Sequence, residues 1–225
     1  MTTSSRAVPQ PPPSADIRER FGEIDIYLFD QLARGRFDAR PRVLDAGCGD
    51  GRNLVYLLRT GFTCYGVDRE PAVVARAARL ALDLAPALPV DHFQVAALDS
   101  LPWDDGVMDA VVCSAVLHFA DDEAHFGRML REMWRVLAPG GLWFARLAST
   151  IGLEAQTGPA GRRVQLPDGS TRFVVDERML LAWTDRLGGR LLDPIKTTNV
   201  QGMRAMTTWC AEKTTSRVAG GGAST

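Results

Sequence analysis

The sequence predicts an α/β protein with a doubly wound, mostly parallel sheet of seven strands and an antiparallel hairpin at one edge. Short apolar runs alternate with segments of helical periodicity from residue 16 to about residue 147. The run Asp109–Val116 is apolar on both faces, which is typical of a central strand in a parallel sheet. Such alternation indicates a parallel sheet that is covered by helices on both faces.

Helices and strands are expected to alternate regularly up to residue 149. The first helix is expected over residues 16–34, because apolar side chains recur there at spacings of three and four. Gly61 suits the end of a helix, and Pro71 suits the first turn of the next one. The remaining strands are expected at 42–46, 63–67, 92–98, 109–116 and 142–147, and the remaining helices at 54–58, 71–85 and 123–137.

The alternation is weaker after residue 149. Residues 150–172 contain several glycine- and proline-containing turns, so a loop is expected there. Asp176 is expected to cap the N-terminus of a helix that ends at Gly188-Gly189. Two further strands, near residues 191–200 and 206–211, are expected to form the antiparallel edge hairpin.

One domain is expected over residues 16–213, between two terminal tails. Residues 1–15 are rich in serine and proline and contain little apolar material, so disorder is predicted. Residues 214–225 are rich in glycine and serine and are predicted to be a flexible end. Hydrophobic residues make up 46% of the 225 residues, a content that is typical of a globular domain with a substantial core.

The charge balance and the lack of long apolar segments limit the expected partners. The chain has 26 basic and 27 acidic side chains, so it offers no overall basic character for binding nucleic acid. No uninterrupted apolar segment is long enough to cross a bilayer, and the N-terminus lacks the apolar region of a secretory signal. We therefore expect a cytoplasmic protein that binds neither nucleic acid nor membrane.

The four cysteines predict neither a disulfide framework nor a metal site. They lie far apart and form no C-x-x-C pair. Most of them lie in apolar, strand-like runs, where a free thiol behaves as a small hydrophobic side chain.

A glycine-rich turn between the first strand and the next helix is the most informative motif. It reads VLDAGCGDGRN over residues 43–53, with glycines at positions 47, 49 and 51. Glycines allow a tight turn there and let a ligand approach the backbone without a Cβ atom in the way. The free amides at the following helix N-terminus favour an anionic or carboxylate group of a ligand. Nineteen residues after Gly49, the second strand ends in Asp68, where a carboxylate is placed to bind ribose hydroxyls.

A nicotinamide dinucleotide is a second interpretation of this turn. Its G-x-G-x-x-G motif requires a third glycine where this chain has Arg52. Asp45 would also lie close to a pyrophosphate, which is an electrostatic mismatch, whereas a ligand with an ammonium group would be attracted to it. A tight turn that binds no ligand is the structural alternative.

Four segments together resemble the class I S-adenosylmethionine-dependent methyltransferases. They are VLDAGCGDGRN, the strand end GVDRE at 66–70, the segment LPW-x4-MDAVVCSAVLHF at 101–119 and LAPGGLWF at 137–144. The resemblance covers roughly residues 16–213 and implies a Rossmann-like fold with S-adenosyl-L-methionine as cofactor. Arg52-Asn53 with the following Leu/Tyr run is also weakly similar to the tellurite-resistance methyltransferase branch.

The resemblance assigns a role to each matching position. The turn residues Asp45, Gly47, Cys48, Gly49 and Asn53 would hold the methionine part of the cofactor. Asp68 would bind the ribose diol, and Arg69 would lie beside the adenine. Ser114 would offer its carbonyl oxygen to the cofactor ammonium group, with Ala115 beside it.

The adenine edge departs from the family pattern. Leu98 and Asp99 would lie there, but many relatives carry an acid at the position of Ala97. Asp99 can substitute for that acid only if the third strand continues to it. Tyr27, on the N-terminal helix that covers the cofactor in relatives, is expected to reach the cofactor carboxylate with its hydroxyl.

His118 is the candidate general base, because it follows the fourth strand, where cofactor and acceptor meet in the family. Its ordinary pKa suits proton transfer near neutral pH. The alternative is a histidine that packs beside Phe119 at the start of a helix. Asp121 and Asp122 could orient the imidazole or could cap the following helix.

The acceptor is expected to be a small molecule that carries negative charge. It would enter between the N-terminal helix and the loop at 150–172. Arg146, near the end of the fifth strand, faces the region where acceptors bind in this fold, and Arg162, Arg163 and Arg204 add positive charge. Surface arginines without such a role are the alternative.

The predicted function is methyl transfer from S-adenosylmethionine to an oxygen, nitrogen, sulfur or chalcogen centre. Ser114-Ala115-Val116-Leu117 stands where enzymes that methylate bases or glutamine carry an N/D-P-P-Y motif, so such acceptors are disfavoured. A protein that senses the cofactor without turnover is one alternative, because binding and catalysis share the glycine turn. A nicotinamide-dependent oxidoreductase is the other.

Overall fold

The structure is a computed structural model, and it describes residues 14–154 and 161–215. The predicted tails at 1–15 and 214–225 lie largely outside these ranges, as does part of the loop predicted at 150–172.

The described chain forms one large mixed sheet and a small separate hairpin. The strands of the large sheet are β1 (Arg42–Ala46), β2 (Thr63–Asp68), β3 (Phe93–Val95), β4 (Met108–Ser114), β5 (Leu137–Ser149), β8 (Gly189–Leu191), β9 (Lys196–Val200) and β10 (Arg204–Lys213). The separate hairpin contains β6 (Arg163–Gln165) and β7 (Thr171–Phe173).

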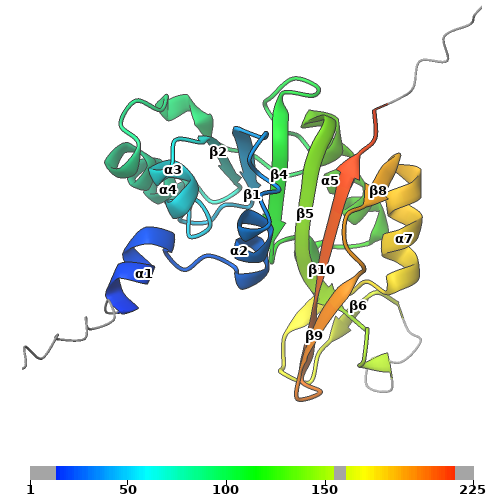
Figure 1. Ribbon diagram of the computed structural model, residues 1–225. Helices are drawn as coiled ribbons and strands as arrows, with labels where there is room; N and C mark the ends of the chain where they lie inside the picture. The colour runs from blue at the N-terminus through cyan, green and yellow to red at the C-terminus, as the bar shows by residue number, and fades with distance from the viewer. Residues whose placement is uncertain (1–13, 155–160, 216–225) are drawn as a thin grey trace, which may run out of the picture.

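The strand order is β3-β2-β1-β4-β5-β10-β8, and β9 also pairs with β10. The pairs among β1 to β5 are parallel, and β10 is antiparallel to β5, β8 and β9. This order confirms the doubly wound, mostly parallel sheet with an antiparallel edge (Figure 1). The described sheet has eight strands because the strand expected near 191–200 is divided into β8 and β9.

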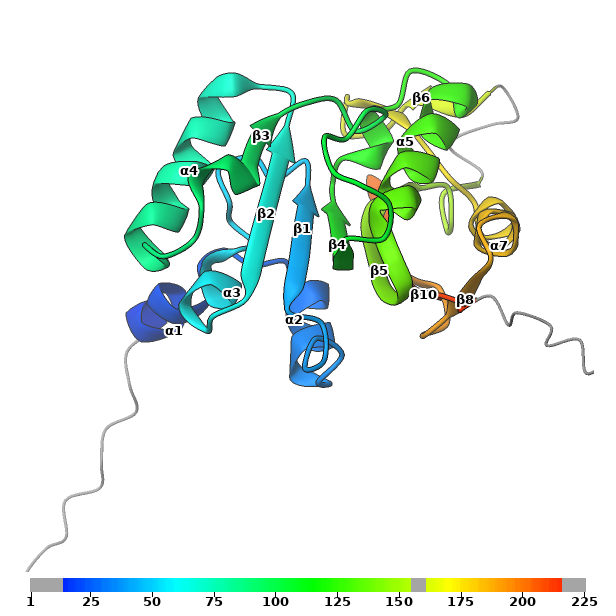
Figure 2. The same ribbon diagram turned by 90° about the horizontal axis from the view of Figure 1, so that it is seen from above.

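Helices cover both faces of the sheet (Figure 2). They are α1 (Ser14–Phe21), α2 (Ile26–Ala33), α3 (Val55–Arg59), α4 (Pro71–Leu84), α5 (Glu123–Val136) and α7 (Glu177–Arg186), with short 3₁₀ turns η1 (Val90–His92) and η2 (Leu117–Phe119). Residues from α2, α3 and α4 pack into one apolar cluster with one face of the sheet. Residues from α5 and α7 pack into another cluster with the opposite face.

The single helix predicted at 16–34 is wrong, because the chain forms two helices there. Gly22 has a φ of +64°, a left-handed conformation that ends α1. Asp25 starts α2, since its carboxylate accepts a hydrogen bond of 2.9 Å from the backbone N–H of Tyr27. The apolar pattern crosses this break because Phe21, the last residue of α1, packs against Phe29 of α2 and Tyr56 of α3.

Three other segments differ from the prediction. β3 ends at Val95 instead of residue 98. β5 begins at Leu137 instead of residue 142, because Leu137 already pairs with Met108 and a register shift follows before Ala110. Pro139, Gly140 and Gly141, which lie between the predicted helix and the predicted strand, are therefore inside β5. The hairpin β6–β7 lies within the region that was expected to be an irregular loop.

The four cysteines are free and buried. Burial raises the pKa of the Cys210 thiol to about 12 and raises the pKa of the other three thiols as well. Among the described residues, no helix has the length and the apolar character that crossing a membrane requires.

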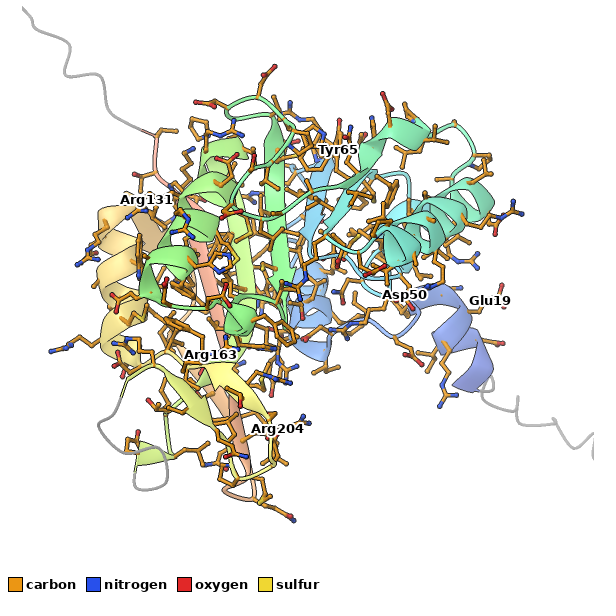
Figure 3. All side chains as sticks on the ribbon, turned by 180° about the vertical axis from the view of Figure 1, so that it is seen from behind. Glu19, Asp50, Tyr65, Arg131, Arg163 and Arg204 are labelled. Atoms are coloured by element: carbon orange, nitrogen blue, oxygen red, sulfur yellow. The ribbon has the colours of Figure 1, made fainter. Side chains whose placement is uncertain are left out.

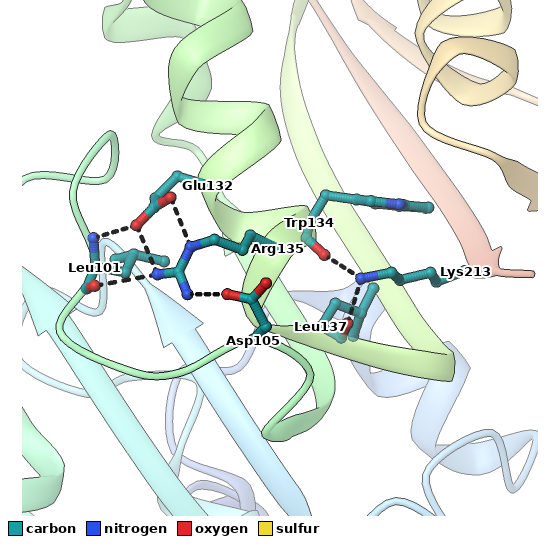
Figure 4. A network of polar contacts seen from close by, with 7 residues as sticks. All are labelled: Leu101, Asp105, Glu132, Trp134, Arg135, Leu137 and Lys213. Atoms are coloured by element: carbon teal, nitrogen blue, oxygen red, sulfur yellow. Dashed lines mark hydrogen bonds and ion pairs between the residues drawn. The ribbon is translucent and has the colours of Figure 1, made fainter. Parts of the chain in front are cut away.

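Two polar networks fix the elements around α5 (Figure 4). Arg135 forms ion pairs with Glu132 and Asp105, both at 2.7 Å, and donates a hydrogen bond to the carbonyl of Leu101. These contacts hold the segment between β3 and β4 on α5. Lys213, at the end of β10, donates hydrogen bonds of 2.7 Å to the carbonyls of Trp134 and Leu137. It thereby satisfies acceptors that the C-terminal end of α5 leaves free.

Replacing Lys213 tests this second network. Lys213→Met should lower the free energy of unfolding by about 1–3 kcal/mol, because two carbonyl groups lose a charged donor. Lys196→Met is the matched control, since Lys196 is exposed. Chemical denaturation of the three proteins measures the difference, and equal midpoints would contradict the role of Lys213.

Candidate functional site

A cavity of about 460 Å³ lies at the carboxyl ends of β1, β2 and β4. In open α/β sheets, ligands bind outside the carboxyl ends of the strands, where the strand order reverses. Here the order reverses between β1 and β4. The cavity is lined by Gly47, Arg52, Asp68, Arg69, Ala96, Ala97, Leu98, Ser114, Ala115, Val116, Phe119, His125 and Met129.

The glycine turn forms part of the wall of this cavity. Gly47 has a φ of +78°, and a Cβ atom added there would lie 2.4 Å from Cγ2 of Val116. The backbone N–H groups of Gly47 and Cys48 both donate to the carbonyl of Val67, at 2.8 and 2.9 Å. The turn is therefore fixed to β2, and only glycine fits at position 47 without displacing Val116.

Asp68 is held at the cavity by backbone donors. Its Oδ2 accepts a hydrogen bond of 3.1 Å from the N–H of Gly49, and its Oδ1 accepts one of 3.1 Å from the N–H of Glu70. A carboxylate has about four acceptor sites, so both oxygens can still accept hydrogen bonds from ligand hydroxyls.

Asp45, on β1 just before the turn, is a buried carboxyl group without a hydrogen-bond partner among the described residues. Asp45 is only 1% exposed. Burial raises the pKa of Asp45 to about 7, and the nearby positive charge of Arg52 and the side chain of Asn53 oppose this shift. A buried acid with no close hydrogen-bond donor favours a ligand that brings a positive charge or a donor.

The buried carboxylate of Asp25 connects α2 to the ends of two strands. Its Oδ2 accepts hydrogen bonds of 3.0 Å from Oγ of Ser114 and from Nη1 of Arg146. Its backbone N–H donates to Oδ1 of Asn53 at 3.0 Å. Arg52 donates to Oγ of Ser114 at 3.3 Å and thus joins the same cluster.

Six of the predicted cofactor residues come together at the first cavity. They are Gly47, Asp68, Arg69, Leu98, Ser114 and Ala115. Ala115 has a φ of +64°, a left-handed conformation that costs a residue with a Cβ atom about 1–2 kcal/mol. Such strain concentrates at functional sites.

The other predicted cofactor residues are Tyr27, Asp45, Cys48, Gly49, Asn53 and Asp99, and they do not line this cavity. The hydroxyl of Tyr27 is hydrogen-bonded to Thr198 on β9, and Asn53 holds the backbone of Asp25. β3 ends at Val95, and Asp99 forms an ion pair of 3.5 Å with Arg128; Ala97 lines the cavity and Asp99 does not. The thiol of Cys48 donates a hydrogen bond to the carbonyl of Gly49.

A second cavity, of about 320 Å³, adjoins the first. The two share Ala115 and Phe119 as lining residues, so these residues form the boundary between them. The walls of the second cavity come from η2, β5, the β6–β7 hairpin and the β9–β10 hairpin. It is lined by Ala115, His118, Phe119, Arg146, Ala148, Leu166, Asp168, Ser170, Arg172, Val200, Arg204 and Met206.

His118 lines the second cavity and not the first. Burial, together with the positive charge of Arg172, lowers the pKa of His118 to about 4. The imidazole is therefore neutral at physiological pH. Its buried Nδ1 has no hydrogen-bond partner among the described residues.

The arginines that were predicted to attract an anion divide into two groups. Arg146 and Arg204 line the second cavity, and Arg204 extends from the β9–β10 hairpin (Figure 3). Arg162 forms an ion pair with Asp176 at 3.2 Å, and Arg163 donates to the carbonyl of Ala120 and lies near Asp121. Arg162 and Arg163 do not line the second cavity.

The sequence interpretation missed several residues at these sites. Asp25 was hidden inside the predicted continuous helix, although an aspartate before an apolar helical run is a signal for an N-cap. Arg172 was missed because its hairpin was interpreted as a loop. Phe119 and Met129 gave no sequence signal that distinguishes a cavity wall from the core. The described residues contain no cluster of three or more His, Cys, Asp or Glu side chains that could hold a metal ion.

Comparisons with known proteins agree with this geometry. Residues 44–145 match the family described as a methyltransferase domain. An uncharacterised methyltransferase of Mycobacterium tuberculosis is 30% identical over 163 residues, which cover 66% of this chain and 60% of that protein. This chain thus matches less than two thirds of that relative's length.

Solved structures share the fold. A S-adenosylmethionine-dependent methyltransferase of Methanosarcina mazei superimposes with a TM-score of 0.66 at 19% identity, covering 81% of this chain and 97% of that one. The 1,6-didemethyltoxoflavin-N1-methyltransferase of Burkholderia thailandensis, solved with S-adenosylhomocysteine, gives 0.64 at 20% identity, covering 90% and 83%. The narrower likeness to the tellurite-resistance branch is not tested by these matches and stays a prediction. Residues 44–145 thus match a methyltransferase domain, and the fold of the described residues is that of the solved methyltransferases; together with the relative, these findings support a class I S-adenosylmethionine-dependent methyltransferase.

Proposed function

We propose that the protein transfers a methyl group from S-adenosylmethionine to a small-molecule acceptor that carries negative charge. One observation carries the proposal: a cavity with a glycine turn and a fixed carboxylate adjoins a second cavity that is rich in arginine. The first suits the cofactor, and the second suits an acceptor. The formal net charge of −1 does not favour nucleic acid as the acceptor.

The residues at the first cavity fit the cofactor. Asp68 retains acceptor sites for the ribose hydroxyls, and Gly47 brings the main chain of the turn to the cavity wall. Asp45, buried behind the glycine turn, and the carbonyl of Ser114 would attract the cofactor ammonium group. Leu98 and Arg69 would lie against the adenine, in a site where the acid found in many relatives is replaced by Ala97.

The cofactor supplies a methyl group that is activated by its positively charged sulfur. The protein has mainly to align the two reactants and exclude water, which can contribute about 7–11 kcal/mol to lowering the barrier. Ala115 and Phe119, at the boundary of the cavities, would position the acceptor atom. His118 would take the proton when the acceptor must lose one.

Two alternatives remain testable within the same experiment. A cofactor sensor would bind S-adenosylhomocysteine but transfer no methyl group to any acceptor. A nicotinamide oxidoreductase would bind the reduced dinucleotide instead, although Arg52 and Asp45 oppose that ligand. Calorimetry with both ligands, followed by an assay of methyl transfer over a broad acceptor panel, separates the three functions.

The Asp68→Ala variant tests the cofactor site. We expect it to weaken S-adenosylhomocysteine binding by about 1–3 kcal/mol, because a charged hydrogen-bond partner is removed. Asp104→Ala, at an exposed position outside both cavities, should bind like the wild type. Titration calorimetry measures both, and unchanged affinity in Asp68→Ala would remove the ribose assignment.

The glycine turn allows a matched steric test. Gly47→Ala and Gly49→Ala both place a side chain at positive φ, but only the Cβ atom at position 47 would overlap a neighbour, Val116. Gly47→Ala should therefore lose at least tenfold more affinity for S-adenosylhomocysteine than Gly49→Ala, which is about 1.4 kcal/mol. The second substitution Val116→Ala should restore part of the loss. Equal losses in the two single variants would contradict the close approach.

The pH dependence tests His118. Because its pKa is about 4, its neutral, proton-accepting form is present throughout the range above pH 4 and is lost only as the pH falls through that value. Turnover of an oxygen acceptor should therefore show no inflection from this residue between pH 5.5 and 8 (about 1.5 units or more above its pKa).

His118→Gln should lower kcat by roughly 10²-fold or more without changing the affinity for S-adenosylhomocysteine. His92→Gln is the control, because His92 stacks on Tyr65 outside both cavities. A wild-type inflection near pH 6.5 that disappears in His118→Gln would refute the low pKa.

A further inference from the structure

The arginines of the second cavity differ in how far their charge is already compensated. Arg146 forms an ion pair of 3.0 Å with the buried carboxylate of Asp25. By contrast, no carboxylate among the described residues lies within ion-pair distance of Arg172 or Arg204. Arg172 donates to the carbonyl of Thr171 and lies over the ring of Phe119, with its Cζ atom 4.8 Å from the ring centre.

Asp168 is the acid that lines the same cavity. Its Oδ1 accepts hydrogen bonds from the N–H and the hydroxyl of Ser170, which lower the pKa of Asp168 and keep it ionised. The positive charges of Arg204 and Arg172 also lower the pKa of Asp168, so the three charges lie close enough to influence one another without forming an ion pair. Because His118 is neutral at physiological pH, Arg172, Arg204 and Asp168 together leave an excess of one positive charge in the wall.

The remaining lining is apolar. Phe119 is 50% exposed and stands at the boundary with the cofactor cavity. Leu166, Val200 and Met206 contribute from the two hairpins. A volume of about 320 Å³ is at the lower end of the range of ligand pockets, about 300–1,000 Å³, so it suits a body the size of a single ring.

We infer that the second cavity selects an acceptor with a single-ring apolar body and one carboxylate, which is bound by Arg172 and Arg204. The inference rests on the proposed methyl transfer and specifies its acceptor. The carboxylate lies between the two hairpins, and the ring lies along the apolar part of the lining, which brings its other end toward Ala115 and the cofactor cavity. The ionised carboxylate of Asp168 disfavours binding of a dianion, because it would repel the second negative charge of the ligand.

Binding of small acids to the protein saturated with S-adenosylhomocysteine tests the inference. The probes are benzoate, 4-hydroxybenzoate, 2-aminobenzoate and nicotinate, each compared with its neutral amide, and phenyl phosphate as a dianion. At least one carboxylate should bind tenfold or more tightly than its amide, and phenyl phosphate should bind more weakly than benzoate. A tenfold difference in affinity is about the contribution of one hydrogen bond to a charged group.

Charge variants assign the effect to residues. Arg172→Gln and Arg204→Gln should each reduce the preference for the carboxylate over its amide roughly tenfold, and Arg172→Lys should retain part of it. Arg163→Gln, on the neighbouring strand β6 and outside the cavity, should have no effect. Asp168→Asn should increase carboxylate affinity several-fold, a gain that damage to the fold would not produce.

The outcomes separate this inference from the proposed function. If S-adenosylhomocysteine does not bind, the proposed function itself fails. If it binds but no carboxylate is preferred over its amide at millimolar concentration, only the acceptor class is overturned. A preference that survives in Arg172→Gln and Arg204→Gln, or tighter binding of phenyl phosphate than of benzoate, would overturn the assignment to these two arginines and a single charge.

Discussion

The buried carboxylate of Asp25 is the interaction on which the geometry of both cavities depends. It caps α2 through Tyr27, and it binds Ser114 at the end of β4 and Arg146 near the end of β5. Ser114 lines the first cavity and Arg146 lines the second. Removing one partner of a buried ion pair destabilises a protein by about 3–5 kcal/mol, because the other charge stays buried and unpaired. One side chain thus fixes the relative positions of the walls of two sites.

The two cavities are electrostatically opposite. Asp45 and Asp68 place acidic groups at the glycine turn, where a positively charged cofactor would bind. Arg172 and Arg204 place positive charge in the wall of the second cavity. Ala115 and Phe119 separate the two regions with small or apolar side chains. Methyl transfer removes positive charge from the cofactor sulfur. It requires from the protein mainly that the acceptor and the cofactor are aligned where such side chains exclude water.

Much of the fold could be predicted from the sequence, because its central elements are specified locally. Pro71 and the apolar periodicity predicted α4 nearly to the residue, and Asp176 predicted the start of α7. The break at Asp25 could not be distinguished in the same way, because α1 and α2 continue one apolar pattern. The strand pairing that extends β5 back to Leu137 depends on its partner Met108, which no local pattern indicates.

The candidate site was predictable where it depends on backbone geometry and less so where it depends on distant contacts. Gly47 and Asp68 follow from the turn between a strand and a helix, and both line the first cavity. Tyr27 was expected at the cofactor, but its hydroxyl contacts Thr198, far away in the sequence. Arg172 and Arg204 come from hairpins whose position over the sheet edge is a matter of tertiary packing. The sequence shows that these residues are charged, but it does not show which residues they contact.

The four buried thiols can serve as probes of local opening in this protein. Each lies on a strand of the sheet or in the glycine turn, and burial keeps each thiol protonated and inaccessible to electrophiles. An alkylating reagent can therefore modify a given thiol only while the surrounding structure is open. The rate at which Cys48 reacts would report opening of the glycine turn, and the rate at Cys210 would report opening of the antiparallel edge.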